Sequence, residues 1–386
     1  MIVIFYFFLV FVYALNFVAI ANAIYYIIFL KQIIKDRFKI AFVGNSASKV
    51  FFFLFISWIT LTTLFYNIFS GHIIDSRSIT QYLFNFQYFI LIVLFRFKVK
   101  SFENWIYYFS ILLSITIIGI IITYGISFDS LRDNEVLNSN IPGYPNSTSI
   151  PLLVALWLAF KREKIIWAKL LFIVALVFTG SRGALLGIIL VIFYFGYKKI
   201  RTTKYYLIIF SFIIFLFFSA LVYLNSLNPL LISQMTRSYD REDIFKTTMA
   251  YVELNPLTGY GGNTIDQLQD VKINYSPYNN WGHTHNWILE ILLRYGVVGL
   301  LLFLGFILSI YKSIKDKDSK YMFAVYLFIA FFQTFIRDFV FIFFLAYFAN
   351  YSIENNIPKI QLKNRLKRTG IKTLRIRQIS LQVVGN

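Results

Sequence analysis

The stretch "WILEILLRYGVVGLLLFLGFILSI" (residues 287–310) holds 24 residues and only two charged side chains, Glu290 and Arg294. A helix of this length extends about 36 Å at 1.5 Å per residue, which exceeds the roughly 30 Å hydrocarbon core of a bilayer. The stretch therefore predicts a membrane-spanning helix. Glu290 precedes Arg294 by four residues, the order that favours an ion pair on one helical face, so we expect a structural pair there.

Apolar runs of similar length recur along all 386 residues, 58% of which are hydrophobic and only 14% charged. No segment of useful size remains for a soluble domain. We therefore predict an all-α polytopic membrane protein with 11 or 12 transmembrane helices. The count depends on residues 1–30, which could form one retained span or a short hairpin. The chain has no cysteine, which excludes disulfides and thiol catalysis.

Six clusters of basic residues indicate on which side of the membrane the ends of these runs lie. They contain 28 of the 37 Lys and Arg residues, and only six of the 18 acidic residues lie in or beside them. Cytoplasmic loops are enriched in Lys and Arg, so we assign all six clusters to the inner face and attribute the net charge of +19 to topology, not to nucleic-acid binding. The clusters lie at residues 31–49, 96–100, 161–169, 198–204, 312–320 and in the tail from Lys359.

Between these clusters each segment must leave the inner face and return. The predicted outward spans are 50–69, 103–123 and 205–224, and the predicted return spans are 79–95, 150–160 and 287–311. The resulting parts are N-terminal transmembrane helices (1–164), a hairpin plus a span (165–224), a large outer loop (225–286), C-terminal transmembrane helices (287–351) and a basic inner tail (352–386).

Two segments, 165–197 and 321–351, begin and end at inner clusters and must turn at the outer side. The first turns at "TGSRG" (179–183), and its arms of about 14 residues would extend only about 21 Å. Arg182 should therefore lie recessed below the outer surface, where an isolated charge indicates a functional site. The second segment turns at Arg337 and Asp338, which we expect to form an ion pair at its tip.

The cations assigned to the outer side are seven Arg and two Lys, whereas lysine predominates on the inner side. An excess of arginine indicates planar, bidentate recognition of carboxylate or phosphate groups. Structural pairing is the alternative, as for Arg294 and Arg337. Residues 240–254, with Ile244, Met249 and Val252, predict an amphipathic helix in the membrane interface that would hold Arg241 at headgroup depth. Aromatic residues that could stack on sugars follow: Tyr260, Tyr275, Tyr278 and Trp281.

The segment "HTHN" (283–286) holds two of the three histidines of the chain. Asn286 is a good N-cap for the helix that follows. His285 would then lie at the positive end of a helix, which favours neutral imidazole and suits a general base. The alternatives are a simple hydrogen-bonding role and a metal site, although His-x-His lacks an evident third ligand. The "DKD" at 316–318 is interpreted as a solvated charge run.

Three stretches resemble, in order, the signatures of the O-antigen ligase/polymerase superfamily: "TGSRGALLG" (179–187), "REDIFKTTMAYVELNPLTGYGGNT" (241–264) and "HTHNWILEILLRYGVVGLLLF" (283–303). Its members are bacterial membrane glycosyltransferases of the GT-C type, which move a glycan from undecaprenyl diphosphate to another sugar on the periplasmic side. The resemblance is strongest over residues 170–305. It implies catalytic roles for Arg182, Arg241 and His285, and Phe245 stands near a position where the family often has Trp.

The resemblance implies a periplasmic glycosyltransferase of the bacterial inner membrane that needs no metal and no cofactor. We expect a repeat-unit polymerase; the alternatives are a ligase that attaches glycan to lipid A-core and, from another class, a polysaccharide transporter or lipid flippase. The expected partners are an undecaprenyl-diphosphate-linked oligosaccharide, a glycan or lipid A-core acceptor, membrane lipids and a chain-length regulator protein. The expected substrate-binding residues are Arg182, Arg241, Tyr260, Trp281, His283, Asn286 and Arg337.

Overall fold

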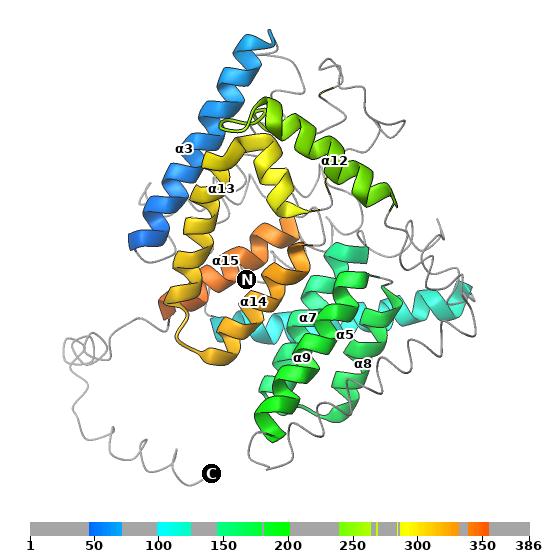
Figure 1. Cartoon of the computed structure of the whole chain (residues 1–386). Helices are drawn as coiled ribbons and strands as arrows, with labels where there is room; N and C mark the ends of the chain where they lie inside the picture. Colours follow the sequence, from blue (N-terminus) through cyan, green and yellow to red (C-terminus); the bar gives the residue numbers. More distant parts are fainter. Residues whose placement is uncertain are drawn as a thin grey trace, which may run out of the picture.

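The computed structural model describes residues 46–71, 99–124, 145–179, 181–200, 239–263, 268, 284, 286–331 and 339–354. These residues are helical with no strand, which confirms the all-α prediction (Figure 1). The helices are α3 (Ser46–Phe69), α5 (Val99–Tyr124), α7 (Pro145–Lys161), α8 (Ile166–Phe178), α9 (Arg182–Ile200), α12 (Tyr239–Leu254), α13 (Trp287–Ser313), α14 (Lys317–Phe331) and α15 (Phe339–Glu354).

Three described segments are long and apolar enough to cross a bilayer: Ser46–Phe69, Phe102–Thr123 and Trp287–Ser313. Their outward faces carry large exposed apolar side chains such as Leu112, Ile122 and Leu301. A water-soluble protein rarely exposes contiguous apolar surface on this scale, so these faces are suited to lipid. The protein is a multi-pass membrane protein. The predicted spans 79–95 and 205–224, like residues 1–30, lie outside the described residues, so the count of 11 or 12 helices stays a prediction.

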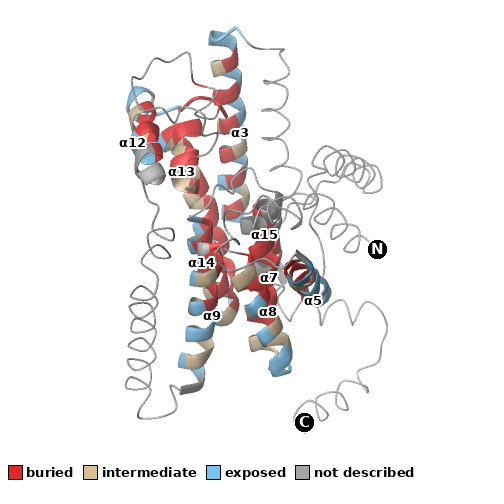
Figure 2. Cartoon of the chain, turned by 90° about the vertical axis from the view of Figure 1, so that its right-hand side faces the viewer, coloured by how far each residue is buried: buried red, intermediate tan, exposed pale blue. Residues whose placement is uncertain are grey.

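Helix α7 forms the centre of the core because it is buried on all sides. Its residues from Leu152 to Ala159 are all buried, including Trp157 (Figure 2). Helices α5, α8 and α9 pack directly against it. On the other side, α3 lies along α13 through ring contacts, with Phe52 5.3 Å from Phe306 and Phe55 5.1 Å from Phe303 between centroids. These helices share one continuous apolar core with α14 and α15, whereas the buried residues of α12 belong to a separate cluster.

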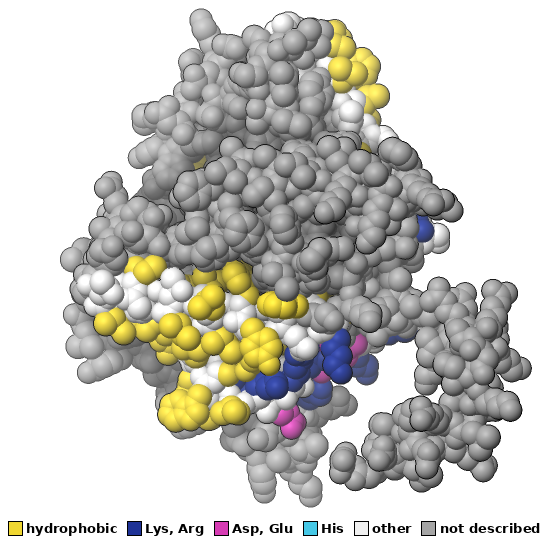
Figure 3. All heavy atoms as spheres, turned by 180° about the vertical axis from the view of Figure 1, so that it is seen from behind, with side chains coloured by type: hydrophobic (Ala, Val, Ile, Leu, Met, Phe, Trp, Pro, Cys, Tyr) yellow, Lys and Arg dark blue, Asp and Glu magenta, His cyan; other side chains and the backbone are white. Residues whose placement is uncertain are grey.

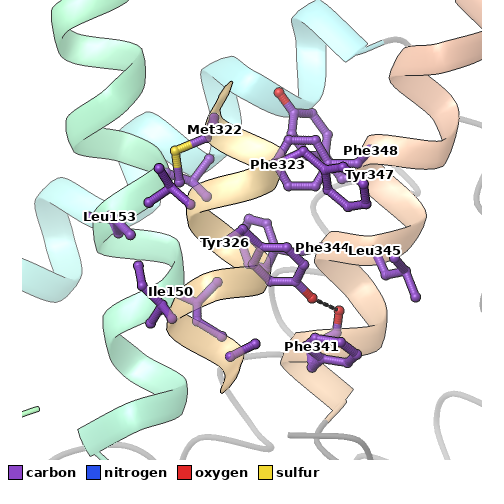
Figure 4. Close-up of a cluster of buried hydrophobic side chains, with 14 of the residues drawn as sticks. Ile150, Leu153, Met322, Phe323, Tyr326, Phe341, Phe344, Leu345, Tyr347 and Phe348 are labelled. Atoms are coloured by element: carbon purple, nitrogen blue, oxygen red, sulfur yellow. Dashed lines mark hydrogen bonds between the residues drawn. The ribbon is translucent and has the colours of Figure 1, made fainter. Parts of the chain in front are cut away.

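The predicted hairpin 321–351 is present as α14 and α15, whose aromatic faces pack in opposite chain directions (Figure 4). The Tyr326 hydroxyl donates to the Phe341 carbonyl at 2.6 Å, and the Phe323 and Phe348 rings lie 4.9 Å apart. The expected ion pair between Arg337 and Asp338 falls outside the described residues.

The other predicted hairpin is α8 and α9, which pack against each other. Helix α8 has 13 residues, close to the expected arm, but α9 has 19. The arm prediction was too short for α9 because the helix continues through Lys198 and Lys199 to Ile200. Residues Thr179, Ser181 and Ala184 near the turn are buried. These three residues beside the turn are thus covered by protein, and the recessed position of Arg182 stays a prediction.

The basic ends of several helices meet at one end of the molecule. Ion pairs join Lys161 to Asp316 at 2.5 Å and Lys198 to Asp318 at 2.8 Å. A third joins Arg162 to Glu103 at 2.6 Å. They connect residues in or beside four of the six predicted inner clusters, which supports a common face for these four. Figure 3 shows Lys and Arg side chains gathered beside an apolar band on the described surface.

The interpretation of "DKD" (316–318) as a solvated charge run was wrong in one respect. Asp316 pairs with Lys161, and its carboxylate accepts the backbone N–H of Ser319 at 3.2 Å, so it caps α14. Asp318 accepts the Tyr194 hydroxyl at 2.7 Å as well as Lys198. Both carboxylates thus join different helices, and no further ligand is needed to explain them.

The charge distribution predicts that two exposed residues, Thr258 and Lys315, lie on opposite sides of the membrane. Because the chain has no cysteine, Thr258→Cys and Lys315→Cys each report a single site. In right-side-out membrane vesicles a membrane-impermeant maleimide should label Thr258→Cys, and Lys315→Cys only after permeabilisation. The reverse pattern would invert the topology.

Candidate functional site

Helix α13 begins where the sequence indicated. Asn286 has extended backbone angles (φ −154°, ψ 121°), and its side-chain oxygen accepts the N–H groups of Ile288 at 2.9 Å and Leu289 at 3.3 Å. The predicted N-cap is confirmed. The positive end of the α13 dipole therefore lies at Asn286 and the residues just before it.

The predicted pair of Glu290 and Arg294 is also confirmed, and both side chains are buried. One Glu290 oxygen contacts Arg294 Nη2, and the other accepts the Thr284 hydroxyl at 2.9 Å and the Thr284 N–H at 3.3 Å. Arg294 Nη1 donates to the Gly262 carbonyl at 2.9 Å. This pair thus connects the third motif, through Thr284, with the end of the second motif, at Gly262.

Helix α13 breaks at Gly296, which has φ 65° and ψ −171°. Such a break removes hydrogen bonds from the helix and leaves polar backbone groups that must find other partners in an apolar setting. The carbonyls of Leu293 and Arg294 accept the N–H groups of Tyr260 at 2.9 Å and Gly261 at 2.8 Å. The Val297 N–H donates to the Pro256 carbonyl at 2.8 Å.

A side chain of α3 satisfies one more group at the break. Trp58 donates its indole N–H to the Tyr295 carbonyl at 2.8 Å. The segment "NPLTGYGGN" (255–263) is therefore docked on α13. Glycine is required at Gly259 and Gly261, which have positive φ, because an added Cβ would lie 2.4 Å from the Arg294 carbonyl carbon and 2.7 Å from the Thr62 carbonyl oxygen.

The structure corrects the role expected for Tyr260. Its side chain is 6% exposed, its hydroxyl donates to the Tyr251 carbonyl at 3.0 Å, and its ring meets those of Tyr66 and Tyr251 edge to face. No face remains for stacking on a sugar. Burial, with smaller effects of Tyr66 and Tyr251, raises the pKa of Tyr260 to about 12. Its phenol is a neutral structural donor.

The predicted helix at 240–254 exists as α12, but its orientation differs from the prediction. Ile244 and Val252, expected to face the membrane interface, are buried in a cluster with Leu293 of α13. The exposed apolar residues are instead Phe245 and Leu254. The apolar face of α12 is therefore buried against the broken helix α13 and not against lipid. Arg241 is in the first turn of α12; its side chain lies outside the described residues.

Ser181 caps α9, a feature that the sequence interpretation missed. Its hydroxyl oxygen accepts the Ala184 N–H at 3.3 Å, and its carbonyl accepts the Leu185 N–H at 3.1 Å. A serine just before an apolar helix is an N-cap signal, and it was available in "TGSRG". Arg182 is consequently the first residue of α9, next to the positive end of that helix. Its side chain is not among the described parts.

Two contacts of α14 bring the first and third motifs to the same region. The Trp287 indole N–H donates to the Leu327 carbonyl at 3.4 Å. On the other side of α14, a Cβ at Gly187 would lie 2.6 Å from Ile329 Cδ1. Helix α9 at Gly187 and helix α13 at Trp287 therefore contact the same end of α14. Every motif is linked to another, the first to the third through α14 and the second to the third through the docked loop.

Several predicted site residues lie outside the described residues: Trp281, His283, His285 and Arg337, with Tyr275 and Tyr278. Among the residues that the structure describes, no group of three or more His, Cys, Asp or Glu could hold a metal ion.

Residues 167–304 match the family model described as O-Antigen ligase, and this segment includes all three motifs. Residues 167–304 are thus similar to the O-antigen ligase family. The resemblance drawn from the motifs is confirmed. A ComP-specific O-oligosaccharyltransferase of Acinetobacter baylyi is 26% identical over 254 residues, which cover 58% of this chain and 46% of that protein. The chain thus spans about half the length of the curated relative that it matches.

The break in α13 at Gly296 predicts a large effect of Gly296→Ala. The backbone angles at Gly296 cost a non-glycine residue about 1–3 kcal/mol, and the new Cβ would lie 2.1 Å from the Leu257 carbonyl oxygen. Purified Gly296→Ala should unfold at a clearly lower temperature than the parent. Gly196→Ala is the control, because a Cβ there meets nothing within 4 Å. Equal unfolding temperatures for both variants would contradict the docked break.

Proposed function

We propose that the protein is a glycosyltransferase that takes a glycan from undecaprenyl diphosphate and joins it to a sugar acceptor at the periplasmic face of the bacterial inner membrane. The observation that carries the proposal is the convergence of the three motifs, with α9 and α13 both capped next to Arg182 and His285. The family match over residues 167–304 and the oligosaccharyltransferase named among the relatives support it.

The proposed reaction breaks the bond between the sugar C1 and the diphosphate oxygen, whose electron pair leaves with the lipid diphosphate. A new bond forms between C1 and the acceptor oxygen, and His285 takes the acceptor proton as general base. Arg182 and Arg241 stabilise the charge that develops on the leaving diphosphate. The positive end of α9 beside Arg182 acts in the same direction. We propose Asn286, His283, Trp281 and Arg337 as residues that bind the substrate.

Repeat-unit polymerisation is the proposed outcome, in which the acceptor is another lipid-linked glycan. The richness in Phe, Ile, Tyr, Lys and Asn implies an AT-rich gene, as polysaccharide-cluster genes often are. Ligation to lipid A-core is the second candidate, which the description of the family model favours. A chain-length regulator is a proposed partner of the polymerase. Purified protein given only lipid-linked repeat units should yield a ladder of products; one transfer, and only with lipid A-core present, would indicate a ligase.

His285 and His283 should differ in this assay. A general base contributes about 10²–10⁴-fold in rate, so His285→Ala should nearly abolish transfer while donor binding persists through the arginines. His283→Ala, the matched control, should lose much less. The assay should proceed in EDTA, because the donor is already activated. Equal loss of activity in both variants would favour a shared metal site over a base. Loss of the parent's activity in EDTA, restored by added divalent metal, would favour it as well.

Arginine-to-lysine variants test recognition of the diphosphate. A lysine keeps the charge but cannot form two parallel hydrogen bonds to phosphate oxygens. Arg182→Lys and Arg241→Lys should therefore lose most transfer activity at normal expression levels, with weaker binding of the lipid-linked donor. Lys246→Arg on α12 is the control and should stay active. Near-parental activity of both lysine variants would show that the two arginines contribute only their positive charge.

A further inference from the structure

The ion pair of Glu290 and Arg294 is fully enclosed and joins two separate segments. Arg294 is 0% and Glu290 3% exposed at the side chain. Glu290 accepts the backbone N–H of Thr284 at 3.3 Å, and the Thr284 hydroxyl lies 2.9 Å from both a Glu290 oxygen and the Asn286 carbonyl oxygen, either of which can accept its proton. Arg294 extends the connection to the Gly262 carbonyl. One carboxylate thus holds the segment before α13, and its guanidinium partner holds the docked loop.

Burial of such a pair removes two charges from water, and replacement by apolar side chains is often neutral or stabilising. Stability alone is therefore a weak explanation for this pair. Breaking it from one side would leave an uncompensated buried charge, so Thr284, Glu290 and Arg294 act as one unit. The unit ends at Thr284, which lies between the two histidines of "HTHN".

We propose that Glu290 and Arg294 are positioning residues for glycan transfer, acting through Thr284 on His285; this rests on the function proposed above. Residue 285 is bonded covalently to Thr284 on one side and to Asn286 on the other. Thr284 is fixed by the Glu290 carboxylate, and Asn286 is fixed by its cap on α13. Both neighbours of the proposed base are therefore anchored.

Anchoring of this kind matters because a base must lie within hydrogen-bonding reach of the acceptor hydroxyl. A displacement of about 1 Å, even one caused by a residue away from the reacting atoms, can cost on the order of 10²-fold in rate. Loss of the Thr284 hydroxyl should relax one anchor without removing the ion pair or the backbone N–H bond to Glu290.

The test compares Thr284→Val with Thr284→Ser. Valine keeps the shape of threonine but lacks the hydroxyl, whereas serine keeps the hydroxyl. Thr284→Val should lower kcat roughly tenfold, with KM for the lipid-linked donor and the unfolding temperature close to those of the parent. Thr284→Ser should retain most of kcat. The control is Thr248→Val on α12, where a buried hydroxyl donates to the Ile244 carbonyl of its own helix; its kcat should not change.

The outcomes separate this inference from the function on which it rests. In one outcome the parent transfers glycan, His285→Ala does not, and Thr284→Val transfers at the parental rate. That result overturns the positioning role and leaves the proposed function intact. In another outcome kcat of Thr284→Val falls only because its unfolding temperature also falls, or kcat of Thr284→Ser falls equally. Either result assigns the ion pair to stability and also overturns the positioning role. Absence of transfer by the parent overturns both proposals.

Discussion

The break in α13 at Gly296 is the constraint on which the docked loop, α12 and α3 depend. It leaves the carbonyls of Leu293, Arg294 and Tyr295 without their helical partners inside an apolar protein, where an unsatisfied polar group costs several kcal/mol. Each of these carbonyls has a new donor, from Tyr260, Gly261 and Trp58 respectively. The docked loop, α3 and α13 therefore stabilise one another in this form.

This dependence explains why two motifs separated in sequence form one structural unit. The glycines of "NPLTGYGGN" let the loop backbone approach the broken turn, and the ion pair of Glu290 and Arg294 joins that turn to Thr284. Helix α12 then packs over Leu293 through Ile244 and Val252. A chain segment that would otherwise be an open outer loop is fixed relative to the start of α13. The first motif joins this unit through α14.

The sequence predicted features that depend on near neighbours or on gross composition. The clusters of basic residues predicted which helix ends lie on the same face. The four-residue spacing predicted the pair of Glu290 and Arg294, and the asparagine at position 286 predicted the cap. It did not reveal the break, because "RYGVVG" lies inside an unbroken apolar run. Tyr260 and the buried face of α12 were misinterpreted for a related reason: they are covered in part by residues far away in the sequence, Tyr66 for Tyr260 and Leu293 for α12. The cap at Ser181 was predictable from local signals and was overlooked.

The central claim is that Arg182, Arg241 and His285 form a single site for a lipid-linked diphosphate and its glycan. The most direct measurement is an electron cryomicroscopy structure of the protein bound to a non-reactive analogue of undecaprenyl-diphosphate oligosaccharide. The account predicts phosphate oxygens about 3 Å from the guanidinium groups of both Arg182 and Arg241, with the His285 imidazole facing the first sugar. A diphosphate bound away from both arginines, for example at the basic inner end near Lys161 and Lys198, would contradict it.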